Sequence, residues 1–171
     1  MQTYTRITRR RPLKDEFEVQ IVQLDPMRVA SGLGFGSNPE EQAWGKILAY
    51  AGKHQLLKSL AKPRFFGFNN PDPTPGSPNY GYEQWMTVAS EAKPEEGIEI
   101  KDIPGGLYAV TRFKNLQLIT ETWKRLLAWQ QQSSYLLGTR QYLEELLTPP
   151  DVPYEEYVFD LYLPVAMPIE A

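Results

Sequence analysis

The chain has 171 residues, of which 42% are hydrophobic and 12% aromatic, and its formal net charge at pH 7 is -3. This length suits one domain or two intimate half-domains with a sizeable core, and the slight negative charge argues against a general nucleic-acid-binding surface. Because the chain has no cysteine and one histidine, disulfides, thiolate metal sites and cysteine nucleophiles are excluded, and we expect no metal and no cofactor. No apolar run approaches the roughly 20 residues that span a bilayer, and the N-terminus lacks the apolar stretch of a signal peptide. We therefore expect a cytoplasmic protein with no membrane partner.

The first 16 residues are basic and poor in apolar side chains. Terminal segments of this kind are commonly solvated. We interpret residues 1–16 as a basic N-terminal arm, to which we assign no function, and residues 17–171 as a single domain.

The first half of the domain predicts a β-β-α-β-β order. Alternating residues predict strands over 18–24 and 27–35, and the Asp25-Pro26 turn between them predicts a hairpin. A helix opens at Asn38, followed by a proline and two acidic residues in its first turn, and strands are predicted over 62–70 and 80–89. The helix carries an apolar stripe at helical spacing, formed by Trp44, Ile47, Leu48, Ala51, Leu56 and Leu57.

The second half predicts the same order. A Pro-Gly-Gly turn joins strands over 98–103 and 107–113 into a second hairpin, a helix covers 117–132, and a strand covers 157–165. Between the last two elements, residues 140–147 have leucines at helical spacing. The equivalent segment of the first half is a predicted strand, and we predict a strand here because tertiary context often overrides local propensity.

Sequence similarity between the halves indicates an internal duplication. Ala43–Tyr50 matches Thr122–Trp129, with the Trp, one Leu and one Ala identical, and Tyr80–Ala89 parallels Tyr157–Ala166. Residues of the preceding strands, from Val19 to Ala30, also have counterparts from Ile98 to Val110. Because the three segments occur in the same order at offsets of 77 to 80 residues, they predict two pseudo-repeats at about 17–91 and 97–166. A duplicated unit commonly has a cleft along its axis, which is where we expect a binding site.

Several segments together resemble a known family, the GyrI-like small-molecule-binding domains. These are the effector-binding domains of AraC-type and MerR-type multidrug-responsive regulators. The resemblance covers about residues 17–166. It rests on Ile103-Pro104-Gly105-Gly106-Leu107-Tyr108-Ala109-Val110, the helix around Trp123, Phe65-Phe66-Gly67-Phe68, Tyr142-Leu143-Glu144 and Asp160-Leu161-Tyr162-Leu163-Pro164-Val165.

The resemblance implies two β-α-β-β halves that form one curved antiparallel sheet with two helices and a ligand groove between the halves. Together with the order read from the residues, this predicts an α+β fold of duplicated β-β-α-β-β halves with a curved antiparallel sheet, two main helices and a central groove. It implies a domain that binds a small hydrophobic or cationic effector. In the family a glutamate on the next-to-last strand pairs with cationic ligands, and the matching position is Glu144, although Glu145-Leu146-Leu147 departs from the usual aromatic-containing strand. Since no helix-turn-helix segment precedes the domain, we expect a stand-alone member without direct DNA binding, with a separate DNA-binding partner for any role in transcription. A homodimer is left open.

Aromatic side chains beside the carboxylate would add cation-π attraction. The alternation of strands puts Tyr142 on the face of Glu144, Tyr82 on the face of Gln84, and Trp85 on the face of Glu83. The predicted ligand-binding residues are Glu144 and Tyr142, with one of Tyr82 or Trp85, and then Tyr108 and Trp123.

Several of these residues also have a purely structural interpretation. Glu144 is also compatible with a solvated acid on an amphipathic helix, and Trp123 with a core anchor. Glu83 and Asp160 occupy equivalent positions, and paired carboxylates could do acid-base work. For these two, an exposed strand face is the interpretation we favour.

Two alternative functions come from the same resemblance. Some stand-alone relatives are hydrolases of electrophilic cyclopropane natural products. In such an enzyme Glu144 would be the general base, and Tyr82 or Trp85 would position the substrate. Certain family members inhibit a topoisomerase through protein interaction.

Overall fold

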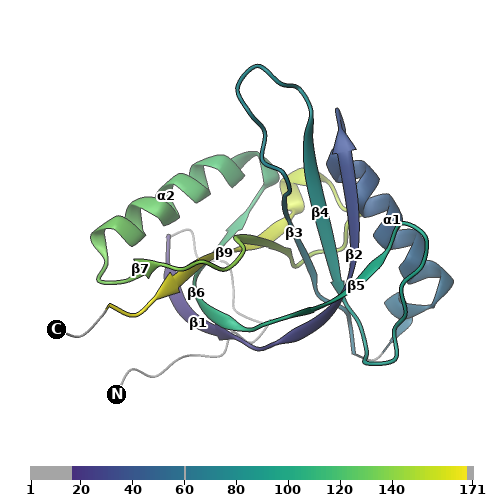
Figure 1. The fold of residues 1–171 in the computed structure, drawn as a ribbon. Coiled ribbons are helices and arrows are strands. Elements are labelled where there is room, and N and C mark those ends of the chain that lie inside the picture. Colours follow the sequence, from purple (N-terminus) through teal and green to yellow (C-terminus); the bar gives the residue numbers. More distant parts are fainter. Residues whose placement is uncertain (1–16, 60, 169–171) are drawn as a thin grey trace. The chain divides into compact units, whose positions relative to one another are not determined.

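The computed structural model describes residues 17–59 and 61–168, which form an α+β fold of antiparallel strands with two α-helices (Figure 1). The fold class is therefore as predicted, whereas the basic arm at 1–16 lies outside the described residues. The chain divides into two compact units. We call residues 26–104 the central unit, and residues 17–25 with 105–168 the terminal unit.

The central unit has four strands in the order β3-β4-β2-β5, each antiparallel to its neighbours. Its elements are β2 (Met27–Gly36), α1 (Pro39–Lys53), the short 3-10 helix η1 (Leu56–Lys58), β3 (Phe65–Asn69), β4 (Tyr80–Thr87) and β5 (Glu99–Ile103).

The terminal unit has the order β8-β9-β6-β1, again antiparallel, and a short strand β7 also pairs with β9. Its elements are β1 (Val19–Leu24), β6 (Gly106–Lys114), η2 (Leu116–Leu118), α2 (Ile119–Gln132), β7 (Leu136–Leu137), β8 (Leu143–Leu146), η3 (Tyr154–Glu156) and β9 (Val158–Ala166). The strand predicted within 140–147 is confirmed over Leu143–Leu146.

Both predicted hairpins are wrong. β1 pairs with β6, and β2 pairs with β4 on one edge and with β5 on the other. The two edges of β2 are thus occupied, so β1 cannot add to it. The Asp25-Pro26 and Pro104-Gly105 junctions, predicted as hairpin turns, are the points where the chain passes between the two units.

The two units share one topology. β3, β4, β2 and β5 of the central unit correspond in order to β8, β9, β6 and β1 of the terminal unit, and in each unit the helix follows the strand β2 or β6. This order fits the repeat read from the sequence, and the duplication itself stays a prediction.

Helix α1 covers one face of the central sheet (Figure 1). Ala30 and Met86 from the strands are fully buried with Ile47 from the helix. The first turn of α1 lies close to β2 because residue 34 of this strand is a glycine. A Cβ atom on Gly34 would overlap the carbonyl oxygen of Pro39. Since side chains alternate along a strand, the intervening residues of β2 and β4 point to the face opposite α1.

We predict that Gly34→Ala destabilises the protein by about 1–3 kcal/mol, because the added methyl forces the first turn of α1 away from β2. A matched control is Gly45→Ala, since a Cβ atom at Gly45, inside α1, would meet nothing within 4 Å. Alanine there should stabilise by about 0.5–1 kcal/mol through helix propensity. Urea denaturation midpoints check both values, and a Gly34→Ala midpoint equal to that of the unmodified protein would contradict the packing described.

Candidate functional site

A buried glutamate lies at the centre of the sheet face opposite α1. Glu83, on β4, is only 3% exposed. Its direct cross-strand neighbours are Leu33 on β2 and Phe68 on β3, and such pairs have Cβ atoms about 5 Å apart. The carboxylate therefore sits in an apolar row, where an ionised group is costly unless it is hydrogen-bonded and compensated.

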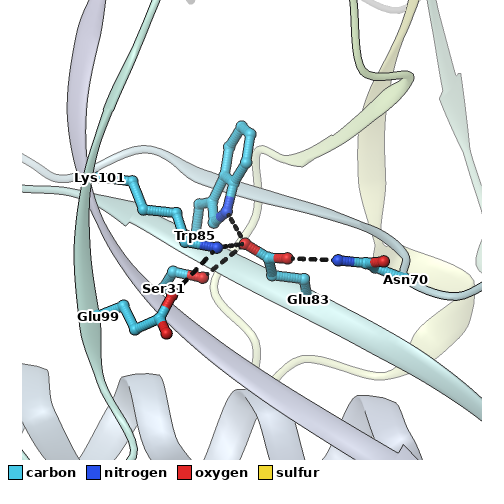
Figure 2. A network of polar contacts seen from close by, with 6 residues as sticks. All are labelled: Ser31, Asn70, Glu83, Trp85, Glu99 and Lys101. Carbon is cyan, nitrogen blue, oxygen red and sulfur yellow. Dashed lines mark hydrogen bonds and ion pairs between the residues drawn. The ribbon is translucent and has the colours of Figure 1, made fainter.

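Four donors meet this carboxylate (Figure 2). Oε1 accepts hydrogen bonds from Ser31 Oγ at 2.7 Å, Trp85 Nε1 at 2.7 Å and Lys101 Nζ at 2.6 Å. Oε2 accepts one from Asn70 Nδ2 at 2.9 Å. Three of the donors are neutral, and the ammonium group of Lys101 supplies the positive charge.

Three of the four donors come from segments distant from Glu83 in the sequence. Ser31 is on β2, and Trp85 is two residues along β4 from Glu83, on the same face. Asn70 follows β3 at the point where the chain crosses closely over Gly81, since a Cβ atom on Gly81 would overlap the Asn70 carbonyl oxygen. Asn70 N also donates to Gly81 O at 2.8 Å. This glycine lets the Asn70 backbone approach β4 closely enough for its amide to reach Glu83.

Electrostatics keep Glu83 ionised. Burial by itself raises the pKa of the carboxyl group, but the hydrogen bonds from Lys101, Trp85, Asn70 and Ser31 outweigh it, so that the pKa is lowered below 4.5. Hydrogen bonds to the charged form act in this direction. The site thus presents a carboxylate, rather than a carboxylic acid, at neutral pH.

Lys101 differs from the other donors in being accessible. Its side chain is 34% exposed, and its Nζ also lies 3.4 Å from Oε2 of Glu99, whose side chain is 77% exposed. Burial disfavours the charged ammonium, but the hydrogen bonds and charges of Glu83 and Glu99 outweigh this and raise the pKa of Lys101. The lysine is therefore a cation placed between one buried carboxylate and one exposed carboxylate.

The terminal unit has its own buried polar cluster on the corresponding face. Nε and Nη2 of Arg112 donate to the two oxygens of Asp160 at 2.7 and 2.8 Å, and Tyr162 Oη donates to Glu145 Oε2 at 2.7 Å. The hydrogen bonds to Asp160 outweigh burial and raise the pKa of Arg112. Glu83 and Asp160 are 3% and 1% exposed, so the expected exposed strand face is wrong for both. The reason is that each carboxylate has a cationic partner: Lys101 reaches Glu83 from β5, across β2, and Arg112 reaches Asp160 from the neighbouring strand β6.

The structure brings three of the predicted ligand-binding residues together. Trp123 on α2 donates from Nε1 to Glu144 Oε1 at 3.1 Å, and its ring stacks on Tyr142 with centroids 5.8 Å apart. Glu144 therefore faces α2, whereas Glu145, the next residue on β8, points to the other face.

The other predicted residues lie apart from that cluster. Tyr108 is buried in the terminal unit, edge-on to Tyr162, with its hydroxyl donating to the Gln141 carbonyl at 3.2 Å. Its burial raises the pKa of the Tyr108 hydroxyl to about 12. In the central unit, Trp85 contacts Phe68 edge-on beside Glu83, while Tyr82 lies against Gly67 on the α1 face.

Sequence reasoning missed the partners of Glu83. Ser31, Asn70 and Lys101 belong to no motif. Strand pairing brings Ser31 and Lys101 to Glu83, and the close crossing at Gly81 brings Asn70. The available signal was the alternation that put Glu83 and Trp85 on one face, since a carboxylate beside an indole N–H is a ready hydrogen-bonded pair.

The comparisons with known proteins identify the family. A family model described as Cass2, integron-associated effector binding protein, matches residues 20–165. The chain belongs to this family. The resemblance to effector-binding domains predicted from the sequence is thus confirmed. A search of curated proteins finds no match.

Solved structures with this fold include regulators and hydrolases. EcmrR in a complex with DNA has a TM-score of 0.68 at 14% identity; the match covers 88% of this chain and 58% of that chain. A hydrolase from Listeria innocua has a TM-score of 0.67 at 11% identity, and the match covers 87% of this chain and 92% of the hydrolase chain. SAV2435 bound to tetraphenylphosphonium has a TM-score of 0.50 at 13% identity, and the match covers 88% of this chain and 94% of the SAV2435 chain. At these identities the likeness shows the fold alone.

Residues 17–59 and 61–168 contain neither a membrane-spanning helix nor a cluster of metal-binding side chains. No helix there is long and apolar enough to cross a membrane. Nor do three or more His, Asp or Glu side chains gather there as a metal site would require.

The lowered pKa of Glu83 predicts acid sensitivity. A carboxyl group whose pKa is lower in the folded than in the unfolded state stabilises the fold above its unfolded pKa, and this contribution is lost as the pH falls through the folded pKa. We expect the free energy of unfolding to decline as the pH falls below about 4.5, and the decline to be shallower in Glu83→Gln.

Glu95→Gln is the control for this measurement, because Glu95 also has a lowered pKa but lies in an exposed pair with Lys53 and His54. Its effect should be small, since solvent screens exposed ion pairs. Urea denaturation between pH 3 and pH 7 gives the comparison. Identical pH profiles for Glu83→Gln and the unmodified protein would show that the network does not stabilise the ionised carboxylate.

Proposed function

We propose that this protein binds hydrophobic organic cations, and that the Glu83 carboxylate with the adjoining Trp85 recognises the positive charge. The proposal combines the effector-binding family with the chemistry of the central unit. A cation of this kind has an apolar surface to bury and a charge to compensate, and the Glu83 face offers partners for both.

The observation that carries the proposal is a buried, ionised carboxylate set among apolar side chains. Glu83 is flanked by Phe68 and Leu33, and Leu33 is 47% exposed although it is apolar. Phe35, two residues further along β2 on the same face, is 57% exposed. Exposed apolar side chains beside a functional polar group are a common feature of binding surfaces.

The energetics favour a cation over a neutral ligand. A cation within reach of an aromatic ring gains about 0.5–2 kcal/mol, more when water is excluded. Opposite charge near a carboxylate of low solvent exposure adds to this, because the surrounding dielectric is lower than that of water. SAV2435, which shares the fold, was solved with a cation of this class, tetraphenylphosphonium, and this supports the choice of probe.

The Glu144 cluster is the competing location for the same function. Its carboxylate, indole and phenol ring form a second acid-aromatic group, as the sequence predicts. We place it second because Glu144 already faces α2, so that a ligand would have to compete with helix packing.

Hydrolysis is the second candidate function. The Tyr162–Glu145 pair, in which both residues are buried, has the acceptor and hydroxyl that general acid-base chemistry needs, and a hydrolase from Listeria innocua shares the fold. Electrophilic cyclopropanes that gain one water on incubation with the protein would support this function, with Glu145→Gln as the inactive control.

We expect tetraphenylphosphonium to raise the melting temperature of the protein. At about 100 times its dissociation constant a ligand adds about 2.7 kcal/mol, which corresponds to about 5–10 °C for a chain of this size. Glu83→Gln should lose most of this shift, because the amide keeps the shape of the side chain without its charge. The neutral comparator triphenylphosphine oxide should give a small shift in both proteins.

Glu144→Gln is the matched control for Glu83→Gln. It removes one carboxylate of the same unit charge from the competing location and should keep the full shift. Loss of the shift in Glu144→Gln and its retention in Glu83→Gln would overturn the Glu83 assignment and favour the cluster predicted from the sequence.

A further inference from the structure

We propose that Lys101 is an internal competitor of cationic ligands: its ammonium group occupies the cation position on Glu83 and moves toward Glu99 when a ligand cation takes that position. This inference rests on the proposed function and names the residue that controls the site. It makes Lys101 a determinant of ligand charge, because only another cation can replace it on the buried carboxylate.

The crowding on Glu83 Oε1 is the first observation behind this inference. A carboxylate has about four lone-pair positions, two on each oxygen. Oε1 accepts hydrogen bonds from three donors, Ser31, Trp85 and Lys101, whereas Oε2 accepts one from Asn70. One donor can therefore leave Oε1 and still leave two hydrogen bonds on that oxygen.

The identity of the leaving donor follows from burial and attachment. Ser31 and Trp85 are 4% and 5% exposed and belong to β2 and β4, the two strands at the centre of the order β3-β4-β2-β5. Lys101 belongs to β5, which ends this order within the central unit, and its side chain is 34% exposed. A lysine has a long, flexible stem and a strongly hydrated head, so it is the donor most easily released.

Glu99 supplies a place for the released ammonium group. Figure 2 shows Glu99 on the side of Lys101 away from Glu83, with a distance of 3.4 Å between Lys101 Nζ and Glu99 Oε2. Glu99 and Lys101 are two residues apart on β5 and so share a face. The movement requires a rotamer change of one side chain and no movement of the backbone.

The remaining donors form a site prepared for a cation. After Lys101 leaves, the hydrogen bonds from Ser31, Trp85 and Asn70 still hold the carboxylate in position. These donors carry no formal charge, and a buried carboxylate without a cation is strongly disfavoured. The exchange therefore selects ligands that are positively charged, and neutral ligands leave Lys101 in place.

The test measures tetraphenylphosphonium affinity in Lys101→Met, which keeps most of the apolar stem and removes the ammonium group. If Lys101 occupies Glu83 for about nine-tenths of the time, its removal tightens binding about tenfold. Affinity for triphenylphosphine oxide should not change. Isothermal titration calorimetry of the full chain gives both constants.

Glu99→Gln provides a second, independent arm. Without the Glu99 carboxylate, the Lys101 ammonium group has no second carboxylate to move to and remains on Glu83. Tetraphenylphosphonium should then bind about threefold more weakly. In the Lys101→Met background, Glu99→Gln should leave the tetraphenylphosphonium affinity unchanged, because that protein has no ammonium group for Glu99 to bind. This dependence on Lys101 separates the proposed exchange from a general loss of surface charge.

The outcomes separate this inference from the proposed function. Tetraphenylphosphonium binding that is equally tight in Lys101→Met and the unmodified protein would overturn the competitor role and leave the cation-binding function standing. Binding by neither protein would overturn both. If Lys101→Met does not fold, the Glu99→Gln arm decides, and unchanged affinity in that variant would overturn the competitor role.

Discussion

The central unit depends on the compensation of one buried negative charge. Glu83 lies in an apolar row of the sheet, and a carboxylate in that position is tolerated only with hydrogen bonds and a cation. The fold supplies both, because strand pairing brings Ser31 and Lys101 to one carboxylate oxygen and a close crossing at Gly81 brings Asn70 to the other. The three neutral donors hold the group in place, and the positive charge is the component that can be exchanged. In the proposed binding mode, a cationic effector is recognised through the release of Lys101 from Glu83.

The same physical solution occurs in the terminal unit with a different cation. Asp160, which corresponds to Glu83 in the predicted repeat, is compensated by Arg112 on the neighbouring strand, which donates two hydrogen bonds to it. A guanidinium that makes a planar, two-point contact is held more firmly than an ammonium group. This difference fits the roles that we propose for the two pairs, with Arg112–Asp160 as a fixed structural pair and Lys101–Glu83 as an exchangeable one.

Local sequence patterns predicted the elements well and their pairing poorly. Alternation located the strands, and the helical spacing of apolar residues located both main helices, with capping residues as a further signal for the first. The predicted repeat favoured a strand at Leu143–Leu146 over the helix that leucine spacing suggested, and the strand is observed. The hairpins failed because a turn at Asp25-Pro26 determines where the chain changes direction and not which strand receives its hydrogen bonds. Alternation likewise placed Tyr142 with Glu144 and Glu83 with Trp85, but it cannot say which face a helix covers. The partners of Glu83 lie between 13 and 52 residues away along the chain, except for Trp85, and no local pattern could have assembled them.

The most direct test of this account is an NMR measurement of the pKa of the Glu83 carboxyl group in Lys101→Met, with and without tetraphenylphosphonium. Removing the lysine takes away the only formal positive charge in the network drawn in Figure 2, so the pKa of Glu83 should rise. Binding of the organic cation should then lower it again, because a positive charge beside the carboxylate favours its ionised form. A pKa that the bound cation leaves unchanged would contradict the claim that Glu83 recognises the charge of the ligand.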